Sequence, residues 1–508
     1  MQMTYEYFSE HARPGALLPV WRDCLLDTDT PVAAFAKLRR GRFAFLLESA
    51  PAGGETWARY TFMGTEPRAA WRLRDGIVHD WSPELGWHGE RRPADPLDDL
   101  RALVAAYEPV EAPELGAFWS GAVGYFGYDV VRLIERLPDA PPQPAGRDIP
   151  DALFVFTRAL VIIDNLHSRA RVVVGVPIDH IDERTLRAAY DDAHRAIDEV
   201  MGRLRAPAVL APLELDPSAP PAVGKSSYER AKFESDVERI REYILAGDAF
   251  QVLLSRRIDV PLDFDSTSLY RALRALNPSP YMYHLALDGV ELVGSSPELL
   301  VRVAKGRVTV RPIAGTRPRG LTSEDDERLE AELLADEKER AEHVMLVDLG
   351  RNDVGRIAEF GSVKVSDLMT VERYSHVLHI VSQVDGQLAP DTSTIDVFRA
   401  TFPAGTMTGA PKVRAMEIIY ELEPESRGPY AGAIGYIAAG DRRMDLAITI
   451  RTCVIADGTA SVQAGAGIVA DSVPSREWEE TENKARAILT AMGRVGGESR
   501  KQKAESSE

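Results

Sequence analysis

The stretch Arg311-Pro-Ile-Ala-Gly-Thr-Arg-Pro-Arg-Gly320 gathers three arginines and two glycines around one small residue, Ala314. Its glycines permit turns that a side chain would hinder, and each arginine carries a fixed cationic fork. Such a turn suits a small anion. Segments typical of strands and of helices alternate on both sides of it, so the sequence predicts a mixed α/β protein with an anion-binding turn at this point.

Composition limits the possible partners of the chain. Its 508 residues are 45% hydrophobic and 27% charged, which is ordinary for a globular protein. The 60 Lys and Arg residues are outnumbered by 78 Asp and Glu residues, for a net charge of −18. An acidic protein of this kind does not bind nucleic acid or an anionic membrane nonspecifically. The sequence therefore predicts no nucleic-acid partner and no membrane partner.

The two cysteines, Cys24 and Cys453, lie far apart in the sequence and form no CxxC pattern. A disulfide framework or a thiolate zinc site is therefore not expected. The first six residues lack the basic and apolar segments of a signal peptide. No apolar stretch approaches the roughly 18–20 residues that a membrane-spanning helix needs, so the expected location is the cytoplasm.

Residues 206–221 hold five prolines and show neither a helical nor a strand period, which indicates a linker. The predicted organisation is an N-terminal domain over 1–205, a linker over 206–224, a second domain over 225–495 and a disordered tail over 496–508. Hydrophobic periodicity predicts a hairpin that turns at 165–168. It also predicts helices over 182–204, 227–245, 323–347, 413–422 and 474–492.

Carboxylates recur on two of these predicted helices. Glu339 and Glu342 are three residues apart and share one helix face, and Glu480 lies one turn before Lys484 on the last helix. Two interpretations remain open at this point. The carboxylates can belong to solvated helix faces, or one from each helix can hold a hard divalent cation such as Mg²⁺.

Three further segments have both a structural and a functional interpretation. The loop 401–412 leads into a helix with hydroxyl and N–H groups that favour a carboxylate, or it is a tight turn. Gly465 and Gly467 permit close approach of the backbone to a ligand, or they mark a bulged strand. His379 is a candidate for proton transfer, although a single histidine is more often structural.

Ten motifs in order resemble those of the chorismate-utilising enzyme family. They occupy residues 247–255, 295–300, 312–319, 341–353, 379–381, 403–412, 428–432, 448–452, 465–469 and 477–484. The resemblance implies the fold of that family, in which antiparallel sheets are sandwiched between helices. It also implies that 225–495 is the chorismate-binding catalytic domain and that 1–205 is a regulatory domain.

The resemblance implies roles for individual residues. Glu298 matches the general acid that assists departure of the C4 hydroxyl, and His379 matches the histidine of the later pyruvate elimination. Glu342 and Glu480, with Glu339 beside them, match the ligands of Mg²⁺. The residues matching groups that contact the substrate are Gly315, Thr316, Thr406, Tyr430, Arg451, Gly465, Gly467 and Lys484, and Thr406 also counts among the catalytic residues.

Two positions distinguish branches of the family. Members that add water resemble one another in a lysine base where this chain has Gln251, and an amide cannot take a proton from water. Aminodeoxychorismate synthases carry a nucleophilic lysine where this chain has Ala314. The expected reaction is therefore attack by ammonia that leads to anthranilate. The alternatives are formation of aminodeoxyisochorismate or of aminodeoxychorismate, and a catalytically silent tryptophan-binding regulator.

The resemblance also implies two further partners. A segment matching the tryptophan feedback site comprises Glu48, Ser49, Pro278, Ser279, Pro280, Tyr281 and Met282, so tryptophan is expected to inhibit the enzyme. Neither cysteine stands in a glycine-rich nucleophile turn, as a glutaminase requires. Ammonia is therefore expected from a separate glutamine amidotransferase subunit of the component II type.

Overall fold

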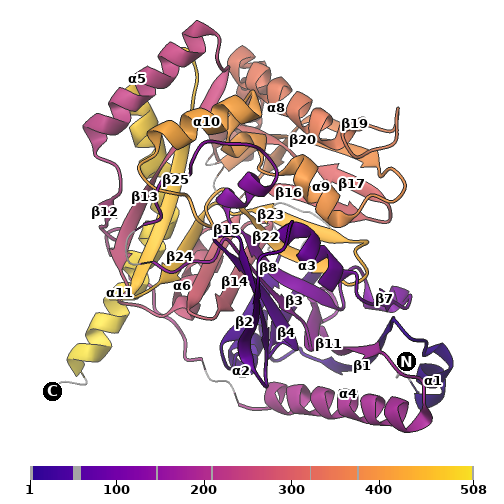
Figure 1. The fold of residues 1–508 in the computed structure, drawn as a ribbon. Helices are drawn as coiled ribbons and strands as arrows, with labels where there is room; N and C mark the ends of the chain where they lie inside the picture. Colours follow the sequence, from indigo (N-terminus) through magenta and orange to yellow (C-terminus); the bar gives the residue numbers. More distant parts are fainter. Residues whose placement is uncertain are drawn as a thin grey trace.

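The computed structural model describes residues 4–49, 59–144, 147–207, 210–320, 322–374 and 377–505. Two large sheets lie in the middle of the molecule and helices cover their outer faces (Figure 1). In this described part, the named strand pairs are antiparallel except for β1 with β7. The predicted fold class, antiparallel sheets between helices, is confirmed.

The first sheet has 13 strands. Along its path they are β12 (Lys225–Ser226), β13 (Gln251–Pro261), β25 (Thr459–Ile468), β24 (Thr452–Ala456), β15 (Val290–Ser296), β14 (Tyr281–Leu287), β2 (Phe43–Glu48), β3 (Tyr60–Thr65), β10 (Ala159–Asp164), β11 (Arg169–Ile178), β1 (Ala16–Leu25) and β7 (Glu108–Pro109), with β21 (Gly409–Ala410) paired to β13. The predicted hairpin is confirmed, since β10 and β11 pair across the turn at 165–168.

The second sheet has 12 strands. Along its path they are β18 (Ile313–Pro318), β20 (Val377–Gln387), β17 (Arg307–Val310), β16 (Leu299–Ala304), β23 (Met444–Ile448), β22 (Ala433–Ala438), β8 (Gly121–Phe126), β9 (Ala152–Phe156), β4 (Ala69–Arg74), β5 (Ile77–Ser82) and β6 (Gly86–Arg91), with β19 (Lys364–Arg373) paired to β20.

Both sheets mix strands from before and after residues 206–224. Strand β2 pairs with β14, so that Glu48 faces Met282, and β8 pairs with β22 in the second sheet. The sheets meet through aromatic contacts such as Phe62 with Tyr436, whose ring centroids are 5.9 Å apart. The two predicted domains therefore share their sheets, and the roles assigned to them stay predictions.

Helices pack on the outer face of each sheet. The long helix α11 contacts β25, α5 and α6, while α4 covers β11 and β1; α8 contacts β18 and β20. The helices are α1 (Tyr5–His11), α2 (Pro31–Leu38), α3 (Pro96–Val104), α4 (Glu183–Leu204), α5 (Arg230–Ala246), α6 (Ser266–Leu276), α7 (Ser323–Ala335), α8 (Glu337–Gly355), α9 (Thr394–Thr401), α10 (Lys412–Leu422) and α11 (Pro474–Glu505).

The structure differs from the sequence predictions at two helices. The helix predicted over 323–347 is interrupted at Asp336, whose extended backbone ends α7 and whose side chain accepts N–H bonds from Lys338 and Glu339 to cap α8. The predicted disordered tail is helical as far as Glu505. Lys, Glu, Gln and Ala favour helix, so they extend a helix that packing has already nucleated.

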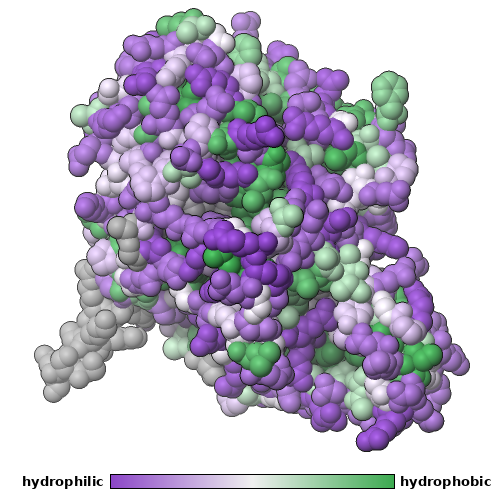
Figure 2. Space-filling model, in the orientation of Figure 1, coloured by the Kyte–Doolittle hydropathy of each residue, from purple (hydrophilic) through white to green (hydrophobic). Residues whose placement is uncertain are grey.

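The surface is mainly hydrophilic. Hydrophilic side chains cover most of the face in Figure 2, and apolar ones occur between them in small groups. Within the described residues, no helix is long and apolar enough to cross a membrane.

Candidate active site

A buried carboxyl, Glu298, stands between strands β15 and β16 and is only 7% exposed. The hydroxyl of Thr406, from the short 3-10 helix Gly405–Met407, donates a hydrogen bond of 3.0 Å to Glu298 Oε1. Burial raises the pKa of Glu298 to about 7, although the Thr406 bond and the charge of Arg451 act in the opposite direction. A carboxyl with this pKa can deliver a proton near neutral pH.

The ring of His379, on β20, is fixed in one tautomer. Its Nδ1 lies 3.0 Å from the carbonyl oxygen of Gly315, which can only accept. Nδ1 therefore carries the proton, and Nε2 has the lone pair. Thr316 Oγ1 lies 3.1 Å from the same Nδ1. Burial lowers the pKa of His379, so the neutral ring can act as a base.

Cationic and backbone groups gather beside Glu298. Lys484 Nζ donates a hydrogen bond of 2.9 Å to the carbonyl oxygen of Gly465. Arg451 has a left-handed backbone, with φ of 50°, and its charge acts on both Glu298 and Tyr430. The structure thus brings together groups from β25, α11 and the connection between β23 and β24 that suit a carboxylated ligand.

Gly467 marks the closest approach of Gln251 to β25. A Cβ at Gly467 would lie 2.4 Å from Gln251 Nε2, so any other residue would displace that side chain. Gln251 Nε2 in turn points at Glu342 Oε1, 3.4 Å away. Close packing of an amide, and not a bulge, therefore explains the glycine in this regular strand.

The two carboxylates predicted to hold Mg²⁺ converge from α8 and α11. Burial, and then the charge of Glu339, raises the pKa of Glu342, and Glu480 adds to this effect. Glu480 lies 2.6 Å from Lys484 Nζ. Among the described residues, no three His, Cys, Asp or Glu side chains are grouped as metal ligands. Two carboxylates nevertheless fit Mg²⁺, which takes few protein oxygens and keeps the rest for water or substrate.

Glu339 is the third carboxylate predicted as a metal ligand. Its Oε1 lies 3.1 Å from Arg317 Nη1, which offsets its charge. The side chain also abuts Gly315, where a Cβ would lie 3.2 Å from Glu339 Oε2 at a φ of 67°. Glu480 is likewise paired, with Lys484 at 2.6 Å, so ion pairing does not separate the carboxylates, and Glu339, Glu342 and Glu480 all stay predicted metal ligands.

The anion-binding turn predicted at 311–320 is wrong as a site for a free anion. Its arginines are paired with carboxylates of the protein: Arg311 with Glu372, Arg317 with Asp336 and Glu339, and Arg319 with Asp326. These pairs brace β18 against β19, α7 and α8. Strand β18 contacts the site through its backbone: a hydrogen bond from the N–H of Ile313 lowers the pKa of Glu298.

A cavity of about 470 Å³ lies between the two sheets, at the predicted tryptophan segment. Glu48, Ser49, Pro280, Tyr281 and Met282 line this inter-sheet cavity.

Pro278 and Ser279 are not among the residues that line the inter-sheet cavity. The carboxylate of Glu48 is held at the cavity wall, since it accepts a hydrogen bond of 2.8 Å from the hydroxyl of Tyr270 and one of 2.7 Å from Arg274 Nη2. A polar ligand in the cavity would therefore meet an oriented carboxylate.

Sequence reasoning missed a buried ion pair behind the site, Glu423 with Arg427. Their side chains are 3% and 1% exposed. Helix α10 ends at Leu422, and Glu423 to Arg427 is not helical, so no helical spacing in the sequence signals this pair.

Comparison with known proteins identifies the family of the chain. The family description "chorismate binding enzyme" matches residues 45–490. Anthranilate synthase component 1 of Aquifex aeolicus is 47% identical over 479 residues, 94% of each chain. That of Pseudomonas putida is 47% identical over 481 residues, 94% of this chain and 95% of its own length.

Solved structures agree in fold. Anthranilate synthase component I from Streptococcus pneumoniae superposes with a TM-score of 0.75 at 36% identity, over 92% of this chain and 99% of its own. The menaquinone-specific isochorismate synthase of Escherichia coli has a TM-score of 0.68 at 18% identity, over 96% and 97% of the two chains, so that likeness concerns the fold alone.

Proposed function

The chain belongs to the family of chorismate-binding enzymes, and we propose that it converts chorismate and ammonia to anthranilate and pyruvate, the first committed step of tryptophan biosynthesis. The observation that carries this proposal is the buried Glu298, an acid with a pKa of about 7 that is hydrogen-bonded by Thr406. The relatives named anthranilate synthase component 1, at 47% identity over nearly the full length, support the same reaction.

The proposed reaction begins at the C4 hydroxyl of chorismate. Hydroxide is a poor leaving group, so Glu298 gives it a proton and it departs as water. Ammonia adds to C2 of the ring and then loses one proton. In the second stage His379 accepts the proton at C2 through Nε2. The enolpyruvyl group then leaves and becomes pyruvate on protonation, and the ring becomes aromatic.

The nucleophile follows from two side chains without acid–base reactivity. Gln251 occupies the position where water-adding members carry a lysine base, and an amide takes no proton from water near neutral pH. Ala314 has only a methyl group where covalent catalysis needs an amine. Both residues support direct attack by ammonia.

We propose that Glu342 and Glu480 hold Mg²⁺. When bound, the metal would offset the negative charge of a substrate carboxylate. Lys484 and Arg451 would then hold the substrate carboxylates as well, by charge-assisted hydrogen bonds. The charges of Arg451 and Lys484 also act on Glu298. A substrate held by these two side chains would therefore lie beside the proposed proton donor.

A glutamine amidotransferase subunit is the proposed source of ammonia. A glutaminase cysteine needs a lowered pKa, whereas burial raises the pKa of both Cys24 and Cys453. Both thiols are free and Cys453 is buried. The chain alone should therefore use ammonium salts and not glutamine.

Tryptophan is the proposed inhibitor, bound in the inter-sheet cavity. Its ammonium group would pair with Glu48, which Tyr270 and Arg274 hold in place. Aromatic and apolar walls, including Tyr281 and Met282, suit an indole ring.

The test is an ammonia-dependent chorismate assay of the purified chain with Mg²⁺, in which the product is identified by mass and fluorescence. Anthranilate fluoresces, whereas aminodeoxyisochorismate, the product if pyruvate is retained, does not. No turnover of chorismate at all would refute the proposal and favour a silent tryptophan-binding regulator.

A further inference from the structure

Arg427 lies at the junction of three segments behind the candidate active site. Its guanidinium is paired with Glu423 through two hydrogen bonds, of 2.8 Å from Nε and 2.6 Å from Nη2. The ring of Tyr128 stacks on it, with the guanidinium carbon 4.5 Å from the ring centroid. A charge this deeply buried requires complete pairing, so its position is fixed.

The first segment that Arg427 holds is the turn Gly405–Met407. Arg427 Nη1 donates a hydrogen bond of 2.7 Å to the carbonyl oxygen of Met407. Met407 follows Thr406, whose hydroxyl bonds Glu298. The direction of the Thr406 hydroxyl therefore depends on a backbone that Arg427 anchors.

The second segment is strand β13. Arg427 Nη2 donates a hydrogen bond of 2.9 Å to the carbonyl oxygen of Leu253. Glu423 Oε1 accepts hydrogen bonds of 2.8 Å from both the backbone N–H and the hydroxyl of Ser255. Leu253 and Ser255 are paired with Gly467 and Gly465 on β25. The pair thus fixes the strand that supports the glycine backbone of the site.

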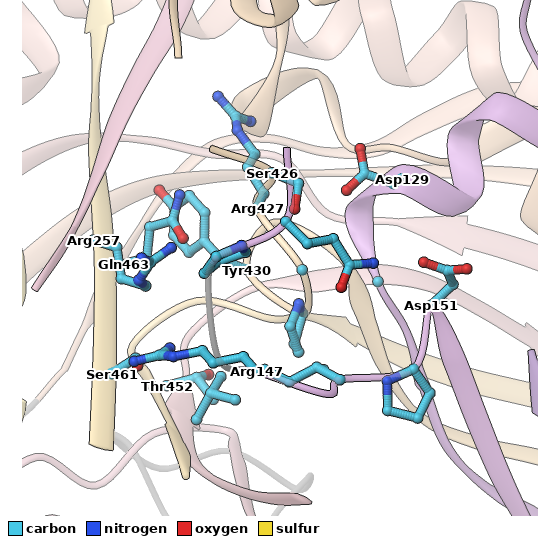
Figure 3. Close-up of a pocket in the computed structure, with 18 residues that line it drawn as sticks. Asp129, Arg147, Asp151, Arg257, Ser426, Arg427, Tyr430, Thr452, Ser461 and Gln463 are labelled. Carbon is cyan, nitrogen blue, oxygen red and sulfur yellow. The ribbon is translucent and has the colours of Figure 1, made fainter. Parts of the chain in front are cut away.

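The third segment is the turn that carries Tyr430. The N–H of Tyr430 donates 3.2 Å to the carbonyl oxygen of Arg427, and the guanidinium carbon lies 5.9 Å from the Tyr430 ring centroid. In Figure 3, Arg427 and Tyr430 border the same small hollow, with Arg147 on its lower side.

We propose that Arg427, locked by Glu423, is a positioning residue that aligns Thr406 and Tyr430 for the reaction. It does not touch the substrate. Its contribution to rate rests on the proposed function, since Thr406 would stabilise the carboxylate of the proton donor and Tyr430 would hold a substrate carboxylate. Misplacement of reacting groups by about 1 Å can cost roughly 100-fold in rate.

The decisive variant is R427K, which keeps the charge beside Glu423 and therefore keeps the buried carboxylate paired. Lysine lacks the planar fork that serves Met407, Leu253 and Glu423 together. We expect kcat to fall about 10- to 100-fold and KM for chorismate to rise, measured well below the unfolding temperature of the variant.

Arg147 provides the matched control. It borders the same hollow, its side chain is 8% exposed, and it is paired with Asp259 at 2.8 Å. Within the described part of the chain, its hydrogen bond is to Asp259 and not to the segments of Thr406 or Tyr430. R147K should lose a comparable amount of thermal stability and keep kcat within about twofold of the wild type.

R427A adds a rescue experiment. The hollow of about 50 Å³ beside Arg427 offers an added cation a route into the space that the side chain vacates. Guanidinium chloride at millimolar concentration should restore kcat several-fold, whereas the same concentration of urea or sodium chloride should not. Loss of rate through misfolding alone would not respond to a planar cation at that concentration.

Hydrogen exchange tests the positioning without substrate. Amides of residues 404–408 should exchange faster in R427K than in R147K. If wild type fails to make anthranilate, the proposed function falls and exchange alone decides the role of Arg427. R427K with wild-type exchange at 404–408, or with a kcat equal to that of R147K, would overturn the inference.

Discussion

Thr406 Oγ1 lies 3.0 Å from Glu298 Oε1, so the proposed proton donor and the turn that faces it are directly bonded. The bond stabilises the ionised carboxyl, while burial destabilises it, and the balance leaves the pKa at about 7. The Thr406 hydroxyl is the largest of the influences that lower this pKa, so it affects the proportion of Glu298 that is protonated at neutral pH.

Thr406→Val should move the alkaline limb of the kcat profile to higher pH. Loss of a hydrogen bond to a charged group costs about 1.5–3 kcal/mol, so the pKa of Glu298 should rise further by about 1–2 units. The pH dependence of anthranilate formation measures this. Thr408→Val is the control, because that hydroxyl bonds only backbone carbonyls, and an unmoved limb in Thr406→Val would contradict the assignment of Glu298 as the acid.

Glu298→Gln should abolish turnover and stabilise the fold at alkaline pH. The folded pKa of Glu298 is raised above the unfolded value, so its contribution is intact below pH 4.5 and is lost as pH rises through 7. The neutral amide avoids that loss, and the gain should reach up to about 3 kcal/mol at pH 8. Urea unfolding at pH 4.5 and pH 8 compares the variants, and equal stability at both would argue against burial of a protonated acid.

Glu342→Gln and Glu480→Gln should each weaken metal binding at least about tenfold. Mutation of a residue that only hydrogen-bonds a metal ligand already has an effect of that size. Titration with Mn²⁺, monitored by the electron paramagnetic resonance signal of the free ion, measures metal binding without the need for turnover. Glu479→Gln, an exposed neighbour on α11, should bind as wild type. Removal of Mg²⁺ by EDTA should stop anthranilate formation, and full activity in EDTA would exclude the metal.

Ala314→Lys should lower anthranilate output about tenfold or more. Ala314 follows Ile313, whose backbone bonds Glu298, so the new ammonium group stands near the ring that ammonia must reach. Ala314→Met separates bulk from charge, since it adds a similar chain without the amine. Wild-type output from the lysine variant would mean that β18 does not border the ring.

Ser49→Ala should raise the tryptophan concentration needed for half inhibition, because Ser49 lines the inter-sheet cavity beside Glu48. Loss of one neutral hydrogen bond costs about 1 kcal/mol, or roughly fivefold in affinity. Ser279→Ala is the matched control, since Ser279 does not line that cavity. Activity of the wild type unaffected by millimolar tryptophan would refute the proposed regulation.

Local patterns predicted individual elements and not their partners. The hairpin of β10 and β11 follows from alternation along adjacent segments, whereas the pairing of Met282 with Glu48 joins strands more than 200 residues apart. No periodicity encodes such a contact. The interruption at Asp336 had a visible signal, because Asp is a favoured N-cap, but the apolar positions continue across it and concealed the boundary.

The candidate site residues were predicted mainly through the resemblance to the family. The ion pairs around them were not predicted. Three arginines in ten residues suggested a free anion site. Glu372, the partner of Arg311, lies on β19, 61 residues further along the chain, and only the fold brings that strand near β18. Conversely, no sequence pattern singled out Arg427, although the fold leaves its side chain only 1% exposed.

The chain segment 297–299 forms a wall with two sides. Pro297 and Leu299 line the inter-sheet cavity, and Glu298 between them turns toward Thr406. A tryptophan that shifts this wall changes the free energy of chorismate binding, and linkage requires chorismate to change tryptophan binding by the same factor. Under the proposed regulation, these three consecutive residues would couple the two sites, and chorismate would weaken tryptophan binding by the same factor as tryptophan weakens chorismate binding.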